Sequence, residues 1–121
     1  MERMTYKPIP EMTRAEIEDA VEADNPDELY IAVLAAALYS QDLEWAQSIC
    51  LALSSHPHWN VRGNAVLGFG HLARLHGSLN EERIKPVIES ALTDSEEYVR
   101  GQAYAAMEDV EQYLEWEVRR P

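Results

Sequence analysis

Four histidines and one cysteine are the side chains of this 121-residue chain most suited to ligating a metal ion. On a helix, two ligands of one ion stand three or four residues apart, so that both side chains face the ion. His71 and His76 are five residues apart and therefore point to different sides of the helix that their surroundings predict. His56 and His58 precede this helix, and His56 stands where a capping residue is expected. We expect no metal site and no cofactor.

Nucleophilic catalysis would need a cysteine or serine held beside a base. Cys50 lies in the apolar run Ile49-Cys50-Leu51, which predicts a buried and inert thiol, and a lone cysteine cannot form an internal disulfide. Ser54-Ser55-His56 is typical of a helix end. The sequence contains no G-x-S-x-G, Walker or dinucleotide-binding motif. These observations favour a protein that is not an enzyme.

The elements that position these residues are all expected to be helices. No run of alternating β-branched residues indicates a strand. Thr13 and Glu16 fit a capping box, and both Asn25-Pro26 and His56-Pro57 fit a capping residue followed by proline. The expected helices cover about 13–23, 26–40, 43–54, 57–76 and 81–92, and the segment Asp94-Ser95-Glu96-Glu97 opens a sixth that continues past Leu114 to about Val118. Pro86 marks a late start or a bend in the fifth helix.

A sequence repeat organises these helices. Asn60-Val61-Arg62-Gly63-Asn64-Ala65 returns 38 residues later as Tyr98-Val99-Arg100-Gly101-Gln102-Ala103, with four of six positions identical. Such a period is typical of a solenoid, in which each unit buries its apolar face against its neighbours. Positions i, i+4, i+7 and i+8 of each second helix share one face and predict the buried seam: Tyr30, Leu34, Ala37 and Leu38; Val61, Ala65, Gly68 and Phe69; Val99, Ala103, Ala106 and Met107.

This pattern resembles the HEAT repeat and its short bacterial relatives. The shared features are a loop Asp or Asn, then Val-Arg, then Ala four residues after the Val, and small and large apolar residues at +7 and +8. The copy that begins at Asp94 matches well, whereas His56 replaces the Asp in the second copy and Tyr30-Ile31 replaces Val-Arg in the first. The resemblance implies that Arg62 and Arg100 pair with acids in the turns between repeats, Asp94 above all.

The resemblance also implies the domain organisation. The fold class is all-α, a short right-handed α-solenoid of about three antiparallel helix pairs. Residues 13–121 are expected to form a single HEAT-like domain with repeats over about 13–40, 42–77 and 80–118. Residues 1–12 read as an extended lead-in, whose Met4, Tyr6 and Ile9 are candidates to cover the end of the first repeat.

The net charge of −12 is concentrated at the two ends of the chain. Residues 1–54 carry 11 acids and 3 bases, residues 55–92 carry 3 and 4, and residues 93–121 carry 8 and 3. This field disfavours nucleic acid and anionic membrane surfaces and favours a basic protein partner. The alternative is that the charge serves only solubility. The absence of a signal peptide, of a membrane-spanning run and of paired cysteines favours a cytoplasmic protein.

The last predicted helix has two contrasting sides. Val99, Ala103, Ala106, Val110 and Leu114 share one side, and an acidic stripe with one aromatic lies opposite. In the two other second helices the corresponding positions are mostly small and apolar, and these are either a surface for a partner or buried by the flanking repeats. The stripe is either a solvated face or a partner site. The candidate partner-binding residues are Tyr39, Leu67, His71, Arg74, Tyr104, Glu108, Glu111, Gln112 and Glu115.

Three tryptophans add a further expectation. Trp45 and Trp59 are predicted to be buried against a neighbouring helix pair, and Trp116 either caps the last repeat or contacts a partner.

These features predict a protein-binding module without an active site. The first hypothesis is an immunity or antitoxin-type inhibitor, monomeric, that occludes a basic effector such as a nuclease toxin. The second is a HEAT-like scaffold or adaptor that binds its partner through a neutral concave centre. Charge reversal at Glu108, Glu111 and Glu115 separates the two, because it removes only the first activity.

Overall fold

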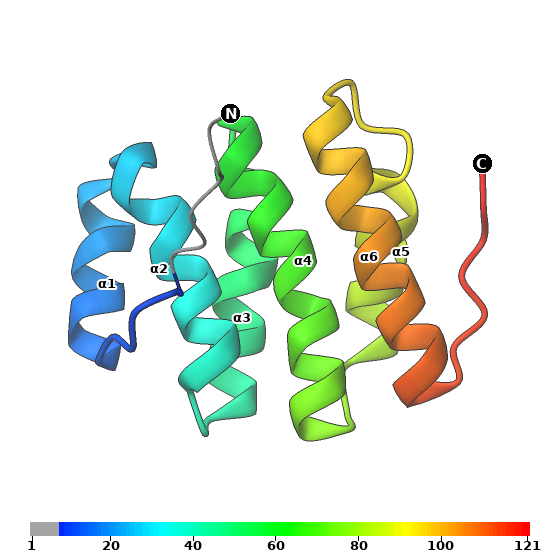
Figure 1. Ribbon diagram of the computed structural model, residues 1–121, viewed down its shortest axis with the longest axis horizontal. Coiled ribbons are helices and arrows are strands. Elements are labelled where there is room, and N and C mark those ends of the chain that lie inside the picture. Colours follow the sequence, from blue (N-terminus) through cyan, green and yellow to red (C-terminus); the bar gives the residue numbers. More distant parts are fainter. Residues whose placement is uncertain (1–7) are drawn as a thin grey trace, which may run out of the picture.

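The computed structural model describes residues 8–121. This range holds six helices and no strand, which confirms the predicted all-α class (Figure 1). The helices are α1 (Arg14–Ala23), α2 (Pro26–Tyr39), α3 (Leu43–Leu53), α4 (Trp59–His76), α5 (Glu81–Ala91) and α6 (Glu97–Leu114).

The second helix of each expected pair lies in one row. In Figure 1, α2, α4 and α6 stand side by side, α1 lies at one end of the row, and α3 and α5 lie behind it. Helix α4 is central, because it packs against α2, α3, α5 and α6. This arrangement is compatible with the predicted solenoid, and the HEAT resemblance and the repeat boundaries stay predictions.

Four of the predicted helix starts are confirmed by their caps. Thr13 and Glu16 form both bonds of the capping box, with Thr13 Oγ1 accepting from the Glu16 amide at 3.1 Å and Glu16 Oε1 accepting from the Thr13 amide at 2.8 Å. Asn25, Asp42 and Asn80 each accept a hydrogen bond from an amide of the first turn. Helix α5 begins at Glu81 and includes Pro86, so the late start near Lys85 was wrong.

One predicted start is wrong, and another agrees with the structure. Helix α4 begins at Trp59 rather than at Pro57, and its cap residue His58 makes no side-chain cap bond. The imidazole of His56 instead bridges two segments: its Nδ1 accepts from the His58 amide at 3.0 Å and its Nε2 lies 2.7 Å from Asp24 Oδ1. Helix α6 begins at Glu97, within the segment 94–97 that was expected to open it, and Asp94 Oδ1 accepts from the Glu96 amide in the preceding turn.

The C-terminal end of α6 also differs from the prediction. The helix stops at Leu114, where Glu115 takes a left-handed conformation with φ 57°. The chain then turns back, and Trp116 and Val118 are buried against the core. Trp116 therefore caps the last helix pair, which was the first of the two alternatives predicted for it. The predicted extension of the helix to about Val118 was wrong, because the chain leaves the helix after Leu114 and places Trp116 and Val118 over the end of the core.

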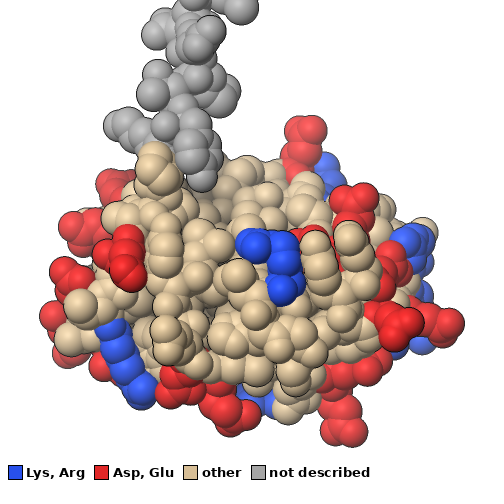
Figure 2. Space-filling view, turned by 60° about the horizontal axis from the view of Figure 1, so that its bottom comes forward, with Lys and Arg blue, Asp and Glu red and all other residues tan. Residues whose placement is uncertain are grey.

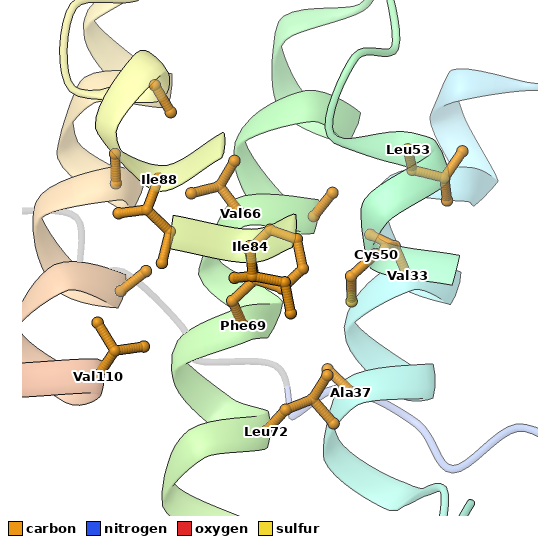
Figure 3. Packing of buried hydrophobic residues seen from close by; sticks show 14 of the residues in the cluster. Val33, Ala37, Cys50, Leu53, Val66, Phe69, Leu72, Ile84, Ile88 and Val110 are labelled. Atoms are coloured by element: carbon orange, nitrogen blue, oxygen red, sulfur yellow. The ribbon is translucent and has the colours of Figure 1, made fainter. Parts of the chain in front are cut away.

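Apolar side chains of successive helices meet around α4. Figure 3 shows Val33 of α2, Cys50 of α3, Phe69 of α4 and Ile84 of α5 in one cluster, and all four are fully buried. Burial raises the pKa of the Cys50 thiol to about 12, which confirms the predicted inert thiol. In the predicted seam, all positions of the second and third copies are buried, whereas Tyr30 and Leu38 of the first copy are only half-buried.

Glycine allows α4 to lie close to its neighbours. A Cβ on Gly68 would lie 2.7 Å from Cys50 Sγ, and a Cβ on Gly70 would lie 2.7 Å from Asp109 Oδ2. The lack of a side chain at Gly68 and Gly70 therefore serves the close packing of α4 against its neighbours.

Two tryptophans and the N-terminal lead-in agree only in part with their predictions. Trp59 is 42% exposed, so its predicted burial was wrong; it stands in the first turn of α4, at the margin of the helix row. Trp45 is half-buried and lies under the guanidinium of Arg14, 4.9 Å from the ring centroid. Ile9 packs against the first helices, while Met4 and Tyr6 lie outside the described residues.

Candidate protein-binding surface

Three predicted residues form a stripe along α4. Leu67, His71 and Arg74 are spaced by four and three residues, so they share one side of the helix. Leu67 and His71 are half-buried and Arg74 is exposed. His71 Nδ1 lies 3.1 Å from Arg74 Nη2. Because a guanidinium only donates, His71 Nδ1 is the acceptor.

The electrostatics of this stripe favour a neutral His71. Burial lowers the pKa of His71, and the nearby Arg74 guanidinium lowers it further, against the opposing effect of Asp109. With Nδ1 accepting, the hydrogen of the neutral ring is on Nε2. The stripe therefore offers a partner one cation and, beside it, an apolar side chain.

Tyr39 lies at the end of α2, apart from this stripe. Its ring is 43% exposed, and its hydroxyl donates to the Ile9 carbonyl at 2.7 Å. The phenol therefore fixes the lead-in to α2, while one part of the ring stays open to a partner.

The predicted acidic stripe faces away from α4. Gly63 and Gly70 of α4 lie against Tyr98, Gln102, Ala106 and Asp109 of α6, which marks the α4-facing side. Counted at 100° per residue from that side, Tyr104, Glu108, Glu111 and Glu115 lie on the opposite side, at the end of the row. Gln112 lies between the two sides. The candidate residues of α4 and those of the acidic stripe on α6, which the sequence analysis grouped as one set, therefore lie on two different surfaces of the structure.

Two residues of the acidic stripe have other roles. Glu111 forms a bidentate pair with Arg120, with both nitrogen-to-oxygen distances 2.8 Å, and the hydrogen bonds from Arg120 lower the pKa of Glu111. Glu115 is the left-handed residue that ends α6. Tyr104, 43% exposed, and Glu108, also exposed, are the members most open to a partner.

The expected small apolar centre is mostly covered. Gly63, Val66 and Gly70 of α4 are buried, as are Ala32, Ala35 and Ala36 of α2. Of the two alternatives for these positions, burial by the flanking helices is correct. A partner that approached the centre would contact the side chains of Leu67, His71 and Arg74 instead.

Polar contacts join successive helix pairs, and only some of these contacts were expected from the sequence. Arg62 donates two hydrogen bonds of 2.8 Å to the Asp94 carboxylate, which confirms that expected pair. Arg100 has no such acid among the described residues and donates to the Asp94 carbonyl at 2.8 Å. Both arginines therefore hold turns in place.

A buried asparagine links the helices of the row. Asn64 is 2% exposed; its Nδ2 donates to the Tyr30 carbonyl at 2.9 Å, and its Oδ1 accepts from Gln102 at 3.0 Å and from the Tyr98 hydroxyl. Asn64 and Gln102 occupy the same position of the repeat. The repeat could have revealed this role, because a polar residue recurs beside the buried seam.

Trp59 and Tyr98 form an exposed aromatic pair that was not predicted from the sequence. Trp59 and Tyr98 are 42% and 40% exposed, and their rings meet edge to face with centroids 5.1 Å apart. Each residue stands in the first turn of a second helix. Tyr98 is held by its bond to Asn64, so this pair is a firm part of the surface.

On the face shown in Figure 2, most acidic groups lie towards the two ends of the helix row, with some basic groups beside them, and the middle is largely uncharged apart from a small basic group. Within residues 8–121, no group of three or more His, Cys, Asp or Glu side chains is arranged to hold a metal ion. None of the described helices is long and apolar enough to cross a membrane.

Comparison with known proteins bears on the whole fold. No family model and no curated protein matches this chain. The fold matches a chain of a CDI complex. That solved structure is the crystal structure of a CDI (contact-dependent inhibition) complex from Cupriavidus taiwanensis LMG 19424. The match covers 92% of this chain and 98% of that chain, at 26% identity and a TM-score of 0.80. The likeness to the CDI complex therefore extends over nearly all of both chains.

Proposed function

We propose that this chain is the immunity component of a contact-dependent inhibition pair, which binds a toxin and blocks its action. The observation that carries the proposal is the likeness of nearly the whole fold to a chain of a CDI complex. The fold alone does not state which member of a pair a chain is, so the assignment as inhibitor rests on charge.

The charge of −12 suits an inhibitor of a basic effector such as a nuclease toxin. A nuclease needs a positive surface for the phosphate backbone of its substrate. An acidic inhibitor is attracted to that surface, associates with it quickly, and occludes it. A nuclease that itself carried this excess of acids would repel its substrate.

The proposal uses four of the nine predicted partner residues. Tyr104 and Glu108 on the outer side of α6 combine an exposed ring with a carboxylate that has no partner among residues 8–121, and a basic and partly apolar surface would engage both. His71 and Arg74 would contact an uncharged or acidic part of the same partner. The proposal further includes action as a monomer in the cytoplasm.

Isothermal titration calorimetry tests this proposal, with the candidate toxin domain encoded immediately upstream of this chain as the probe. We expect Glu108→Lys to raise the Kd by about tenfold, equivalent to roughly 1.4 kcal/mol. Glu82→Lys on α5 makes the same charge change at another exposed helical acid and should alter the Kd less than about twofold. Equal effects of the two variants would indicate only long-range attraction. An affinity that neither variant changes would favour an adaptor that uses the neutral middle.

A further inference from the structure

A groove lies between α1 and α2, at the opposite end of the helix row from α6. Its volume is about 520 Å³, and Ala20, Ala23 and Ile31 contribute its apolar part. Ala20 and Ala23 lie three residues apart on one side of α1, so their small side chains leave the space open. The side chains of Ala20 and Ile31 are half-buried and Ala23 is exposed.

Carboxylates surround this apolar floor. Asp19 of α1 and Asp27 and Glu28 of α2 line the groove, and all three are exposed. Among residues 8–121, no basic residue lines the groove. The only cation on α1, Arg14, is engaged by Glu18 at 3.3 Å and Asp42 at 3.5 Å. The described residues therefore give the groove a strongly negative rim.

These carboxylates have no partner among residues 8–121. No hydrogen bond or ion pair joins the side chain of Asp19, Asp27 or Glu28 to another described residue, whereas Glu111 of the α6 stripe is paired with Arg120. The α6 stripe offers charge without a hollow. The groove offers both, so its chemistry is the more selective.

We propose that this groove is the anchoring site for a basic segment of the toxin, one that inserts an apolar side chain between α1 and α2 and places flanking Lys or Arg side chains on the carboxylate rim. Charge complementarity identifies this occupant, because an apolar floor within a ring of carboxylates matches a segment that is apolar at its centre and cationic at its edges. The inference rests on the proposed function, since it specifies where that partner binds.

The chain supplies a closely matched control for the rim. Asp27 and Glu28 stand in the first turn of α2 behind the cap Asn25, and Glu81 and Glu82 stand in the first turn of α5 behind the cap Asn80. Reversing either pair changes the net charge equally and removes similar favourable interactions with the helix dipole, and reversing Glu81 also removes its ion pair with Lys85 at 3.3 Å. Only the first pair lines the groove.

Calorimetry with the upstream-encoded toxin domain tests the rim. We expect Asp27→Lys with Glu28→Lys to raise the Kd at least about tenfold, and Glu81→Lys with Glu82→Lys to raise it less than about threefold. Equal losses for the two double variants would overturn the anchoring site. If the wild-type chain does not bind this domain at all, the proposed function fails instead.

A neutral variant tests the floor. Ala23→Leu fills the groove without changing its charge, and Ala23 is exposed, so the variant should fold; we expect a Kd about fivefold higher. An unchanged Kd for Ala23→Leu would overturn insertion of an apolar side chain. Removal of residues 1–7 should change the Kd less than about threefold, and a tenfold gain would overturn the proposal by showing that the chain's own N-terminus fills the groove.

Amide NMR spectra of the wild-type chain give a measurement that needs no substitution. On addition of the unlabelled toxin domain, we expect the signals of Asp19, Ala20, Ala23, Asp27 and Ile31 to shift among the largest in the chain. Shifts confined to α4 and α6 would overturn the anchoring site and leave the proposed function intact.

Discussion

Gly63 and Gly101 occupy the same position of the repeat but have different neighbours. A Cβ on Gly63 would lie 2.8 Å from a ring carbon of Tyr98, whereas no described residue has an atom within 4 Å of a Cβ on Gly101. The difference follows from position, because α6 covers α4 and none of the described helices covers the outer side of α6. Glycine is thus required by packing at one copy and free to change at the other.

We therefore predict opposite effects of the same substitution. Gly101→Ala should stabilise the fold by about 1 kcal/mol, since alanine has the higher helix propensity and no clash arises. Gly63→Ala should destabilise it by about 1 kcal/mol net, because Tyr98 is tied to Asn64 and cannot move without loss of that bond. Urea denaturation measures both, and a Gly63→Ala protein as stable as Gly101→Ala would contradict this packing.

At the scale of elements, one ion pair connects the turn before α6 to α4. Asp94 accepts two hydrogen bonds from Arg62 and one, at 2.9 Å, from the Glu96 amide. The side chains of Arg62 and Asp94 are 17% and 16% exposed. The hydrogen bonds from Arg62 lower the pKa of Asp94 from its ordinary 3.8, against the effect of burial.

This pair predicts a specific pH dependence. Because the pKa of Asp94 is lower in the folded than in the unfolded state, its contribution is complete above about pH 4 and is lost as the pH falls through the folded-state pKa. Asp94→Asn should reduce the free energy of unfolding by about 2 kcal/mol at neutral pH. The difference from wild type should shrink below about pH 4 in urea denaturation series.

Glu82→Gln is the control for this series, since its side chain has no hydrogen-bond partner among the described residues. It should leave stability unchanged within about 0.5 kcal/mol at every pH. A deficit of Asp94→Asn that persisted undiminished at low pH would show that the carboxylate charge is not its cause.

Local signals explain which elements could be predicted. The caps at Thr13, Asn25, Asp42 and Asn80 depend on residues within one turn, and the sequence contains them directly. The end of α6 could not be predicted in the same way, because no glycine marks it. Glu115 adopts the left-handed conformation there, and the next residue, Trp116, packs against the core, a contact that no local pattern contains.

The surface was harder to predict than the helices. Helical periodicity correctly separated the buried side of α6 from Tyr104 and Glu108. It could not reveal that Arg120 would return to pair with Glu111, nor that α1 and α2 would leave a groove between them. Both features depend on the relative placement of two segments, which no single-helix pattern contains.

At the scale of the whole molecule, the face shown in Figure 2 has most of its acidic groups towards the two ends of the helix row and a small basic group in the middle. A basic toxin attracted to this field would be guided to either end, and the anchoring groove at α1 and α2 would then set its position. In this proposal the acidic ends of the row provide the long-range attraction, and the groove between α1 and α2 provides the specific docking site.

Growth of cells that produce the upstream-encoded toxin domain tests the central assignment most directly. We expect that co-production of this chain restores growth to nearly that of toxin-free cells, and that the Asp27→Lys, Glu28→Lys variant protects less than the Glu81→Lys, Glu82→Lys variant. Growth arrest that the wild-type chain fails to relieve, although both proteins are made in soluble form, would contradict its role as an immunity protein.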